Sequence, residues 1–140
     1  MTQAASTLLV TGASRGIGAA TALLAARRGW DIAVNYAHSA EAAEKLAAQV
    51  RTLGRKAITV QADVADEAQV LAMFARLDRE FGPLAGLVNN AGVVAMASRF
   101  VDIDSTRLQR MFAVNVFGTM ACTRQAVLRM STRLGDAGGA

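Results

Sequence analysis

The sequence predicts a single α/β domain with a parallel sheet covered by helices on both faces. Short apolar runs of strand length alternate with longer stretches rich in alanine and leucine, which are strong helix formers. The apolar runs begin at residues 7, 31, 57 and 84, which leaves room for one helix after each strand. This rhythm is typical of βαβ units, whose strands are parallel and whose crossovers are right-handed. We expect residues 1–140 to form one domain without an internal boundary.

Strands and helices can be placed from the residue patterns alone. The expected strands cover residues 7–11, 31–36, 57–62 and 84–90. The expected helices cover residues 16–28, 40–53, 66–81 and 105–130.

Capping residues mark where these helices begin and end. Ser39 is a candidate N-cap for the second helix, and Asp66 for the third, with Gln69 in the position of a capping box. Asp104 or Ser105 opens the last helix. A glycine just beyond a helix favours its termination, and the first three helices are followed by Gly29, Gly54 and Gly82.

Composition and charge exclude several classes of protein. Hydrophobic residues make up 53% of the chain, which is too many for a disordered protein. The net charge is +4, but the basic residues are scattered and aromatics are only 5%, so we expect no nucleic-acid partner. No apolar run reaches the ~18 residues of a membrane span and no secretion signal opens the chain, so we expect a cytoplasmic protein without a membrane partner. The single cysteine, Cys122, excludes an internal disulfide and reads as a core residue, and no metal site is expected.

The stretch TGASRGIG, residues 11–18, joins the first strand to the first helix and is called the glycine loop below. A helix N-terminus offers unpaired N–H groups and a partial positive charge, and both favour a bound phosphate. Gly12 would make the tight turn, Gly16 would let phosphates approach, and Gly18 would let the helix pack closely on the sheet. The spacing therefore predicts a nucleotide diphosphate site, with a simple connecting loop as the alternative.

Two further motifs follow later strands. Asp63 and Val64 come after the third strand, where an aspartate could equally be a cap or turn residue. Asn89–Gly92 ends the fourth strand and would also form an ordinary turn. Both lie at carboxyl ends of strands, where open α/β sheets bind ligands.

At these motifs the sequence resembles the short-chain dehydrogenase/reductase family, whose loop reads T-G-x-x-x-G-x-G. Asp63–Val64, Asn89–Gly92 and Asn115 in FAVNVFG follow in the order in which that family has them. The phrases GASRGIG and VNYA are most similar to its NADPH-dependent reductases of the 3-oxoacyl-carrier-protein reductase type. The resemblance implies a Rossmann-like doubly wound sheet in the order 3-2-1-4, and hydride transfer to a small-molecule carbonyl or from an alcohol.

The resemblance also implies roles for the motif residues. Asp63 would hydrogen-bond the adenine amino group with the Val64 backbone beside it, and residues 90–92 would lie beside the nicotinamide ribose. The expected cofactor-binding residues are Gly12, Ser14, Arg15, Gly16, Ile17, Gly18, Asn35, Tyr36, Ala37, His38, Asp63, Val64, Asn90, Ala91 and Gly92.

The end of the second strand indicates which nicotinamide cofactor is bound. A site selective for NAD places a carboxylate there, but this chain has Asn35 and Tyr36, and Asp31 lies at the far end of the strand. Arg15 in the glycine loop can hold a 2′-phosphate with paired donors. We therefore predict NADP(H) rather than NAD(H), with added contacts from His38 and Ser39, and with an exposed loop position as the alternative for His38.

The catalytic residues that the resemblance implies are represented by Asn115 alone, which would support a water chain for proton relay and whose backbone, bound to that water, would kink the helix. The family's serine and its Tyr-x-x-x-Lys pair have no match, because the sole tyrosine, Tyr36, is followed four residues later by Ala40. We expect either the N-terminal part of an NADPH-dependent reductase, truncated before its catalytic residues and inactive alone, or a non-catalytic dinucleotide-binding module.

Self-association is a further expectation. The fourth strand would form an apolar edge with open hydrogen-bonding groups, and such edges pair with other chains. The last helix carries Met111, Phe112, Val116, Phe117 and Met120, and the resemblance implies that it packs against the same helix of a second subunit. The alternative is that these side chains cover the sheet.

Overall fold

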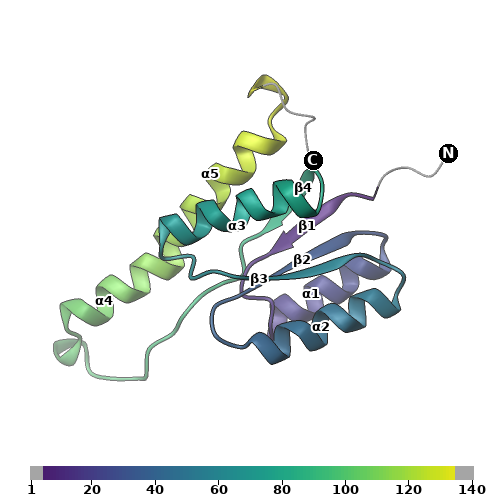
Figure 1. The fold of residues 1–140 in the computed structure, drawn as a ribbon. Coiled ribbons are helices and arrows are strands. Elements are labelled where there is room, and N and C mark those ends of the chain that lie inside the picture. Colours follow the sequence, from purple (N-terminus) through teal and green to yellow (C-terminus); the bar gives the residue numbers. More distant parts are fainter. Residues whose placement is uncertain (1–4, 135–140) are drawn as a thin grey trace.

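A computed structural model describes residues 5–134 of the chain. The strands β1 (Thr7–Val10), β2 (Asp31–Tyr36), β3 (Ala57–Gln61) and β4 (Leu84–Val88) form one parallel sheet in the order β3-β2-β1-β4 (Figure 1). The predicted fold class and strand order are therefore confirmed.

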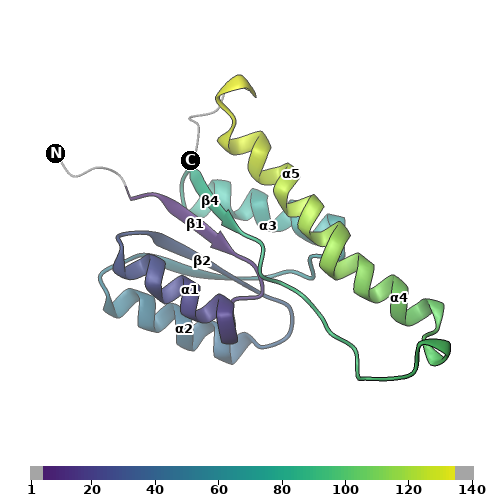
Figure 2. The ribbon, with the colours of Figure 1, turned by 180° about the vertical axis from the view of Figure 1, so that it is seen from behind.

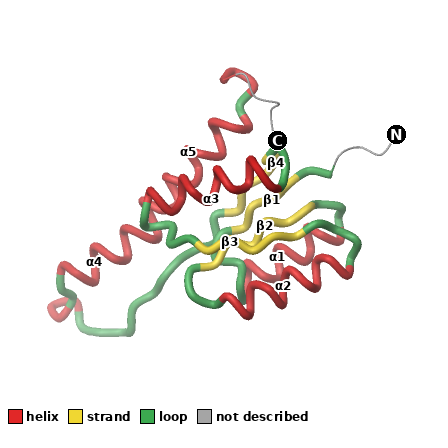
Figure 3. Tube along the Cα trace, in the orientation of Figure 1, coloured by secondary structure: helices red, strands yellow, loops and turns green. Residues whose placement is uncertain are grey.

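Helices cover both faces of this sheet. They are α1 (Gly16–Arg27), α2 (Ala40–Thr52), α3 (Glu67–Glu80), α4 (Ser105–Phe112) and α5 (Thr119–Met130). Figure 2 shows α1 and α2 side by side on one face, and Figure 3 shows the three layers of helix, strand and helix. Helices α3 and α5 lie on the other face, because right-handed crossovers change side where the chain passes from β3 to β4 across the sheet.

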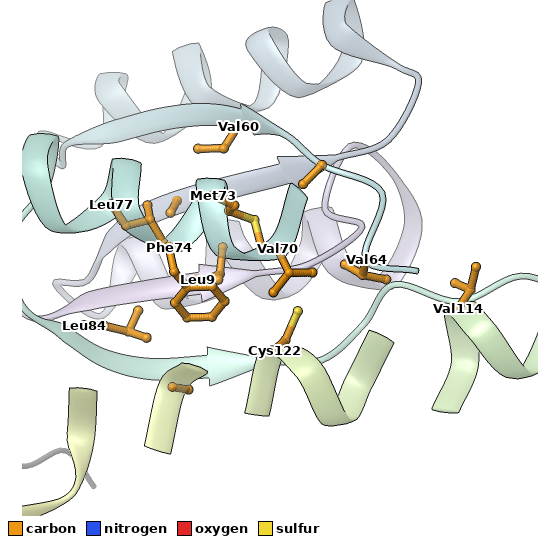
Figure 4. Close-up of a cluster of buried hydrophobic side chains, with 13 residues drawn as sticks. Leu9, Val60, Val64, Val70, Met73, Phe74, Leu77, Leu84, Val114 and Cys122 are labelled. Carbon is orange, nitrogen blue, oxygen red and sulfur yellow. The ribbon is translucent and has the colours of Figure 1, made fainter. Parts of the chain in front are cut away.

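Side chains that alternate along the strands pack into two separate cores, one on each face of the sheet. Leu8 and Val10 of β1 pack with α1 and α2, whereas Leu9 between them packs with α3 and α5. Figure 4 shows the second core, in which Phe74 of α3 and Cys122 of α5 lie beside Leu9. Cys122 is fully buried, and this burial raises the pKa of its thiol to about 11. It therefore packs as the core residue that the sequence predicts.

The expected last helix is a helical rod interrupted by one π-helical turn, Ala113–Gly118, between α4 and α5. Gly118 lies so close to the chain after β3 that an added Cβ would stand 2.7 Å from Val64 Cγ2 and 2.9 Å from the Val64 carbonyl oxygen. The rod thus crosses directly over the end of β3. π-Helical turns interrupt α-helices rarely and often at functional positions.

The helix caps agree with the sequence in part. Asp66 accepts hydrogen bonds from the N–H groups of Ala68 and Gln69, and Asp104 caps α4, which decides between the two candidates there. Gln69 does not complete a reciprocal capping box, because its Oε1 accepts from the N–H of Asp63 at 2.8 Å. Ser39 occupies the N-cap position of α2, but its hydroxyl makes no capping hydrogen bond.

Large apolar side chains remain exposed along the rod. Phe117 and Met120 are 62% and 64% exposed, and Phe112 is 54% exposed, so these three do not cover the sheet. Among residues 5–134, β4 pairs with β1 on one side only. No helix in this described part of the chain is long and apolar enough to cross a membrane.

Candidate functional site

A cavity of about 710 Å³ opens at the carboxyl ends of all four strands, within the usual range for small-molecule sites. The cavity lies where the strand order reverses. The chain runs outward from β1 through β2 to β3 and then returns to place β4 on the other side of β1. Residues after each strand and from the helical rod line it: Gly12, Ser14, Arg15, Gly16, Ile17, Asn35, Ala37, His38, Ser39, Ala62, Asp63, Val64, Asn90, Ala91, Gly92, Val93, Arg110 and Val114.

The glycine loop forms one wall of this cavity. Gly12 and Gly16 adopt φ values of +59° and +61°, a left-handed conformation that other residues rarely adopt. At Gly12 an added Cβ would stand 2.8 Å from Ala91 Cα, so this residue also lets β1 and β4 meet. At Gly16 an added Cβ would meet nothing within 4 Å, because this position faces open space.

The start of α1 leaves hydrogen-bond donors free toward that space. Within residues 5–134, the backbone N–H groups of Ser14, Arg15, Gly16 and Ile17 find no acceptor, and the side chain of Arg15 does not cap the helix. These donors and the positive end of the helix dipole together suit an anion. The cradle around Gly16 therefore fits the diphosphate of a dinucleotide.

Three side chains hold the glycine loop in place. Asn35 is buried, and its Oδ1 accepts from the N–H of Gly12 at 3.0 Å while its Nδ2 donates to the carbonyl oxygens of Val60 and Ala62. Asn90 Nδ2 donates to the carbonyl oxygens of Thr11 and Gly12 at 3.0 and 2.8 Å. The hydroxyl of Thr11 accepts from the N–H groups of Asn90 and Ala91.

Gly18 makes a close approach of a different kind from the one expected. An added Cβ would stand 2.4 Å from Asn90 Nδ2 and 2.9 Å from the Gly12 carbonyl oxygen. Gly18 therefore lets α1 approach Asn90 and the glycine loop itself, rather than the strands of the sheet.

At the end of β3, the carboxylate of Asp63 makes two hydrogen bonds. Its Oδ1 accepts from the N–H of Ala65 at 3.0 Å, which is the turn role left open by the sequence. Its Oδ2 accepts from Arg110 Nη1 at 2.9 Å, and this ion pair joins the end of β3 to α4.

Asn115, in the π-helical turn, clamps the chain that leaves β4. Its Oδ1 accepts from the N–H of Val93 at 2.7 Å, and its Nδ2 donates to the Val93 carbonyl oxygen at 2.8 Å. The side chain thus binds one residue through both backbone groups. Asn115 fixes the segment that carries Ala91 and Gly92 along the cavity wall.

The end of β2 has no acidic residue in the cavity wall. Ala37, His38 and Ser39 line it there, and the exposed guanidinium of Arg15 makes no ion pair or hydrogen bond within residues 5–134. Asp31 lies at the other end of the strand, where its Oδ1 accepts from Arg55 Nη2 at 2.7 Å. The same described part of the chain contains no group of His, Cys, Asp and Glu side chains that could hold a metal ion.

Comparison with known proteins shows the family to which the chain belongs. Residues 6–139 match the family described as short chain dehydrogenase. The chain belongs to the short-chain dehydrogenase family.

Individual relatives of this family are similar over most of the chain. The oxidoreductase YgfF of Escherichia coli is 46% identical over 132 residues, which are 94% of this chain and 53% of that protein. An L-rhamnose 1-dehydrogenase (NAD(P)(+)) of Sphingomonas is 40% identical over 89% of this chain and 48% of its own length. A short chain dehydrogenase from Burkholderia cenocepacia in complex with NADP has a TM-score of 0.85 and 40% identity, covering 89% of this chain and 50% of that one. The chain thus spans about half the length of these relatives.

Most residues predicted to bind the cofactor do line the cavity. Of the predicted cofactor-binding residues, Gly18 and Tyr36 are outside the lining, since Gly18 packs on Asn90 and Tyr36 packs with the core under α1 and α2. Asn115, which was predicted as a catalytic residue, is also outside the lining and holds Val93. The lining residues Ala62, Val93, Arg110 and Val114 were not predicted from the sequence, whereas Ser39 was predicted as an N-cap and, with His38, as an added contact of the cofactor. Arg110 and Val114 share one helix face at i and i+4, but nothing local in the sequence places that face opposite Asp63.

Proposed function

We propose that this chain forms the nucleotide-binding part of an NADP(H)-dependent oxidoreductase, similar to the 3-oxoacyl-carrier-protein reductases, that interconverts a small-molecule carbonyl and its alcohol. The observation that carries the proposal is the open cradle at Gly16, beside which the N–H donors of α1 and the Arg15 guanidinium have no partner among the residues that the structure describes. Bound NADPH would supply the hydride. The NADP complex of the similar Burkholderia protein supports this choice of cofactor.

Each part of the cavity has a task in this proposal. The glycine loop holds the diphosphate, and Asp63 with Val64 receives the adenine. Asn90–Gly92, fixed by Thr11 and by the Asn115 clamp, receives the nicotinamide ribose. Asn115 then acts on the reaction by positioning this segment.

Arg15 would set the preference for NADP(H). A hydrogen bond to a charged group contributes roughly 1.5–3 kcal/mol, so Arg15→Ala should weaken NADPH about 10–100-fold and leave NADH nearly unchanged. Isothermal titration of both cofactors tests this. Equal weakening of the two, or none, would contradict the assignment of Arg15 to the 2′-phosphate.

A non-catalytic dinucleotide-binding module is the second candidate, because the cradle at Gly16 serves binding in either case. The proposal assigns no proton donor within residues 1–140. The oxidoreductase would turn over a carbonyl compound with NADPH, and the non-catalytic module would not. Both candidates require that the dinucleotide binds.

We also propose that the protein is a cytoplasmic homo-oligomer without a nucleic-acid or membrane partner. The exposed Phe112, Phe117 and Met120 on the rod support the oligomer, since their apolar surface is costly to leave in water. Phe117→Lys should lower the mass measured by light scattering. A monomeric mass for the unaltered protein would contradict this proposal.

A further inference from the structure

The ion pair between Asp63 and Arg110 lies in the cavity wall. The two residues are 47 positions apart in the chain, and both line the cavity. The side chain of Asp63 is 28% exposed and that of Arg110 is 48% exposed, so the pair is in contact with the space that a ligand would occupy. Exposed ion pairs of this kind stabilise a fold little, about 0–1 kcal/mol.

The bonds on Asp63 fix its carboxylate at both oxygens. The N–H of Ala65 holds Oδ1 at 3.0 Å and Arg110 Nη1 holds Oδ2 at 2.9 Å. An ionised carboxylate has about four acceptor positions, so about two remain for a donor in the cavity. Without Arg110, Oδ2 would lose its partner and the carboxylate would turn about the single remaining bond.

We propose that Arg110 is a positioning residue for base recognition, which holds the Asp63 carboxylate in the orientation that accepts a hydrogen bond from the exocyclic amino group of adenine. This inference rests on the proposed dinucleotide-binding function. A carboxylate fixed in this way accepts from an amino group and repels a carbonyl oxygen at the same position. The pair therefore selects adenine over hypoxanthine, in which that amino group is replaced by oxygen.

Two other roles for Arg110 predict different behaviour. A guanidinium that stacks directly on the base would favour adenine and hypoxanthine alike, because both present the same aromatic face. A guanidinium that only ties α4 to the sheet would affect stability and every ligand equally. The ratio of affinities for the two bases separates positioning from both of these roles.

The test measures dissociation constants of NADPH and of its deaminated form, nicotinamide hypoxanthine dinucleotide phosphate in the reduced state, by titration calorimetry. Arg124→Ala is the matched control, because it removes the same charge from the same rod, and its pair with Glu67 at 3.6 Å lies outside the cavity. The unaltered protein and Arg124→Ala should prefer the adenine form about 10-fold, as expected for one hydrogen bond to a charged group.

Arg110→Ala should abolish this preference by weakening the adenine form alone, and Arg110→Lys, which keeps a cation near Asp63, should restore part of it. Arg110→Gln gives the same comparison if the alanine variant does not fold. An unchanged preference in Arg110→Ala, or equal weakening of both forms, overturns the positioning role while leaving the proposed function standing. If the unaltered protein binds neither form, the proposed function itself is wrong, and the inference falls with it.

Discussion

Gly16 and Gly54 form a natural pair for testing what the glycine loop does. Both have left-handed backbones, with φ of +61° and +76°, and an added Cβ meets nothing within 4 Å at either position. Replacing either by alanine therefore costs only the backbone strain, about 1 kcal/mol, and should lower the melting temperature by about 2–8 °C. Gly54 lies between α2 and β3, at the amino ends of the strands and thus opposite the cavity.

The two variants should differ in cofactor binding. A methyl group at Gly16 would occupy the open space where the diphosphate approaches the free N–H groups of α1. Loss of even one such charge-assisted hydrogen bond, about 1.5–3 kcal/mol, predicts at least a 10-fold weaker NADPH complex for Gly16→Ala. Gly54→Ala should bind as the unaltered protein does.

Calorimetric titration with NADPH, together with thermal melts of both variants, measures the two effects separately. An NADPH affinity unchanged from the unaltered protein in both Gly16→Ala and Gly54→Ala would refute the reasoning, because it would mean that no phosphate lies against the loop. Equal loss in both would trace the effect to stability and not to the cradle.

The other predictions concern stability. Asn35→Ala leaves the Gly12 N–H and two carbonyl oxygens unpaired, and should lower the free energy of unfolding in urea by about 3 kcal/mol, whereas Asn89→Ala, which loses one exposed bond to Thr123, should change it by less than about 1 kcal/mol. Equal effects would show that Asn35 does not hold the loop. Because burial raises the pKa of Cys122 from 9.0 to about 11, the folded state keeps the thiol proton that the unfolded state loses. The free energy of unfolding should therefore fall by about 2 kcal/mol as the pH rises from 9 to 11, and Cys122→Ala should lack this part of the pH dependence. An identical profile for both proteins would contradict the buried position of the thiol.

The parts of this structure that could be predicted from the sequence are those set by neighbours in the chain. The strands, the helix ends at glycines and the loop around Gly16 depend on local patterns, and all lie where the sequence placed them. The loop's support could not be predicted, because Asn35 reaches the turn after β1 and the end of β3 only once the sheet has formed. From the sequence Asn35 was expected to contact the cofactor at a position without a carboxylate, and not to hold the glycine loop.

The helical rod shows the same limit. Its length followed from apolar spacing and from Asp104 or Ser105, and the resemblance implied a kink at Asn115. The contacts behind the π-helical turn could not be predicted, since Asn115 clamps Val93 and Gly118 presses on Val64 there. Arg110 was missed as a site residue for a related reason, because its partner is 47 positions away and on another element. Contacts between distant segments decide these features, and one sequence without its fold does not report them.

The bracing of the glycine loop by Thr11, Asn35 and Asn90 has a kinetic consequence. A turn that is fixed by side chains of the folded protein has its binding shape before any nucleotide arrives. Capture then needs no slow rearrangement of the turn, so each productive collision leads directly to the complex. The lifetime of the complex, and not the speed of its formation, should distinguish good nucleotides from poor ones.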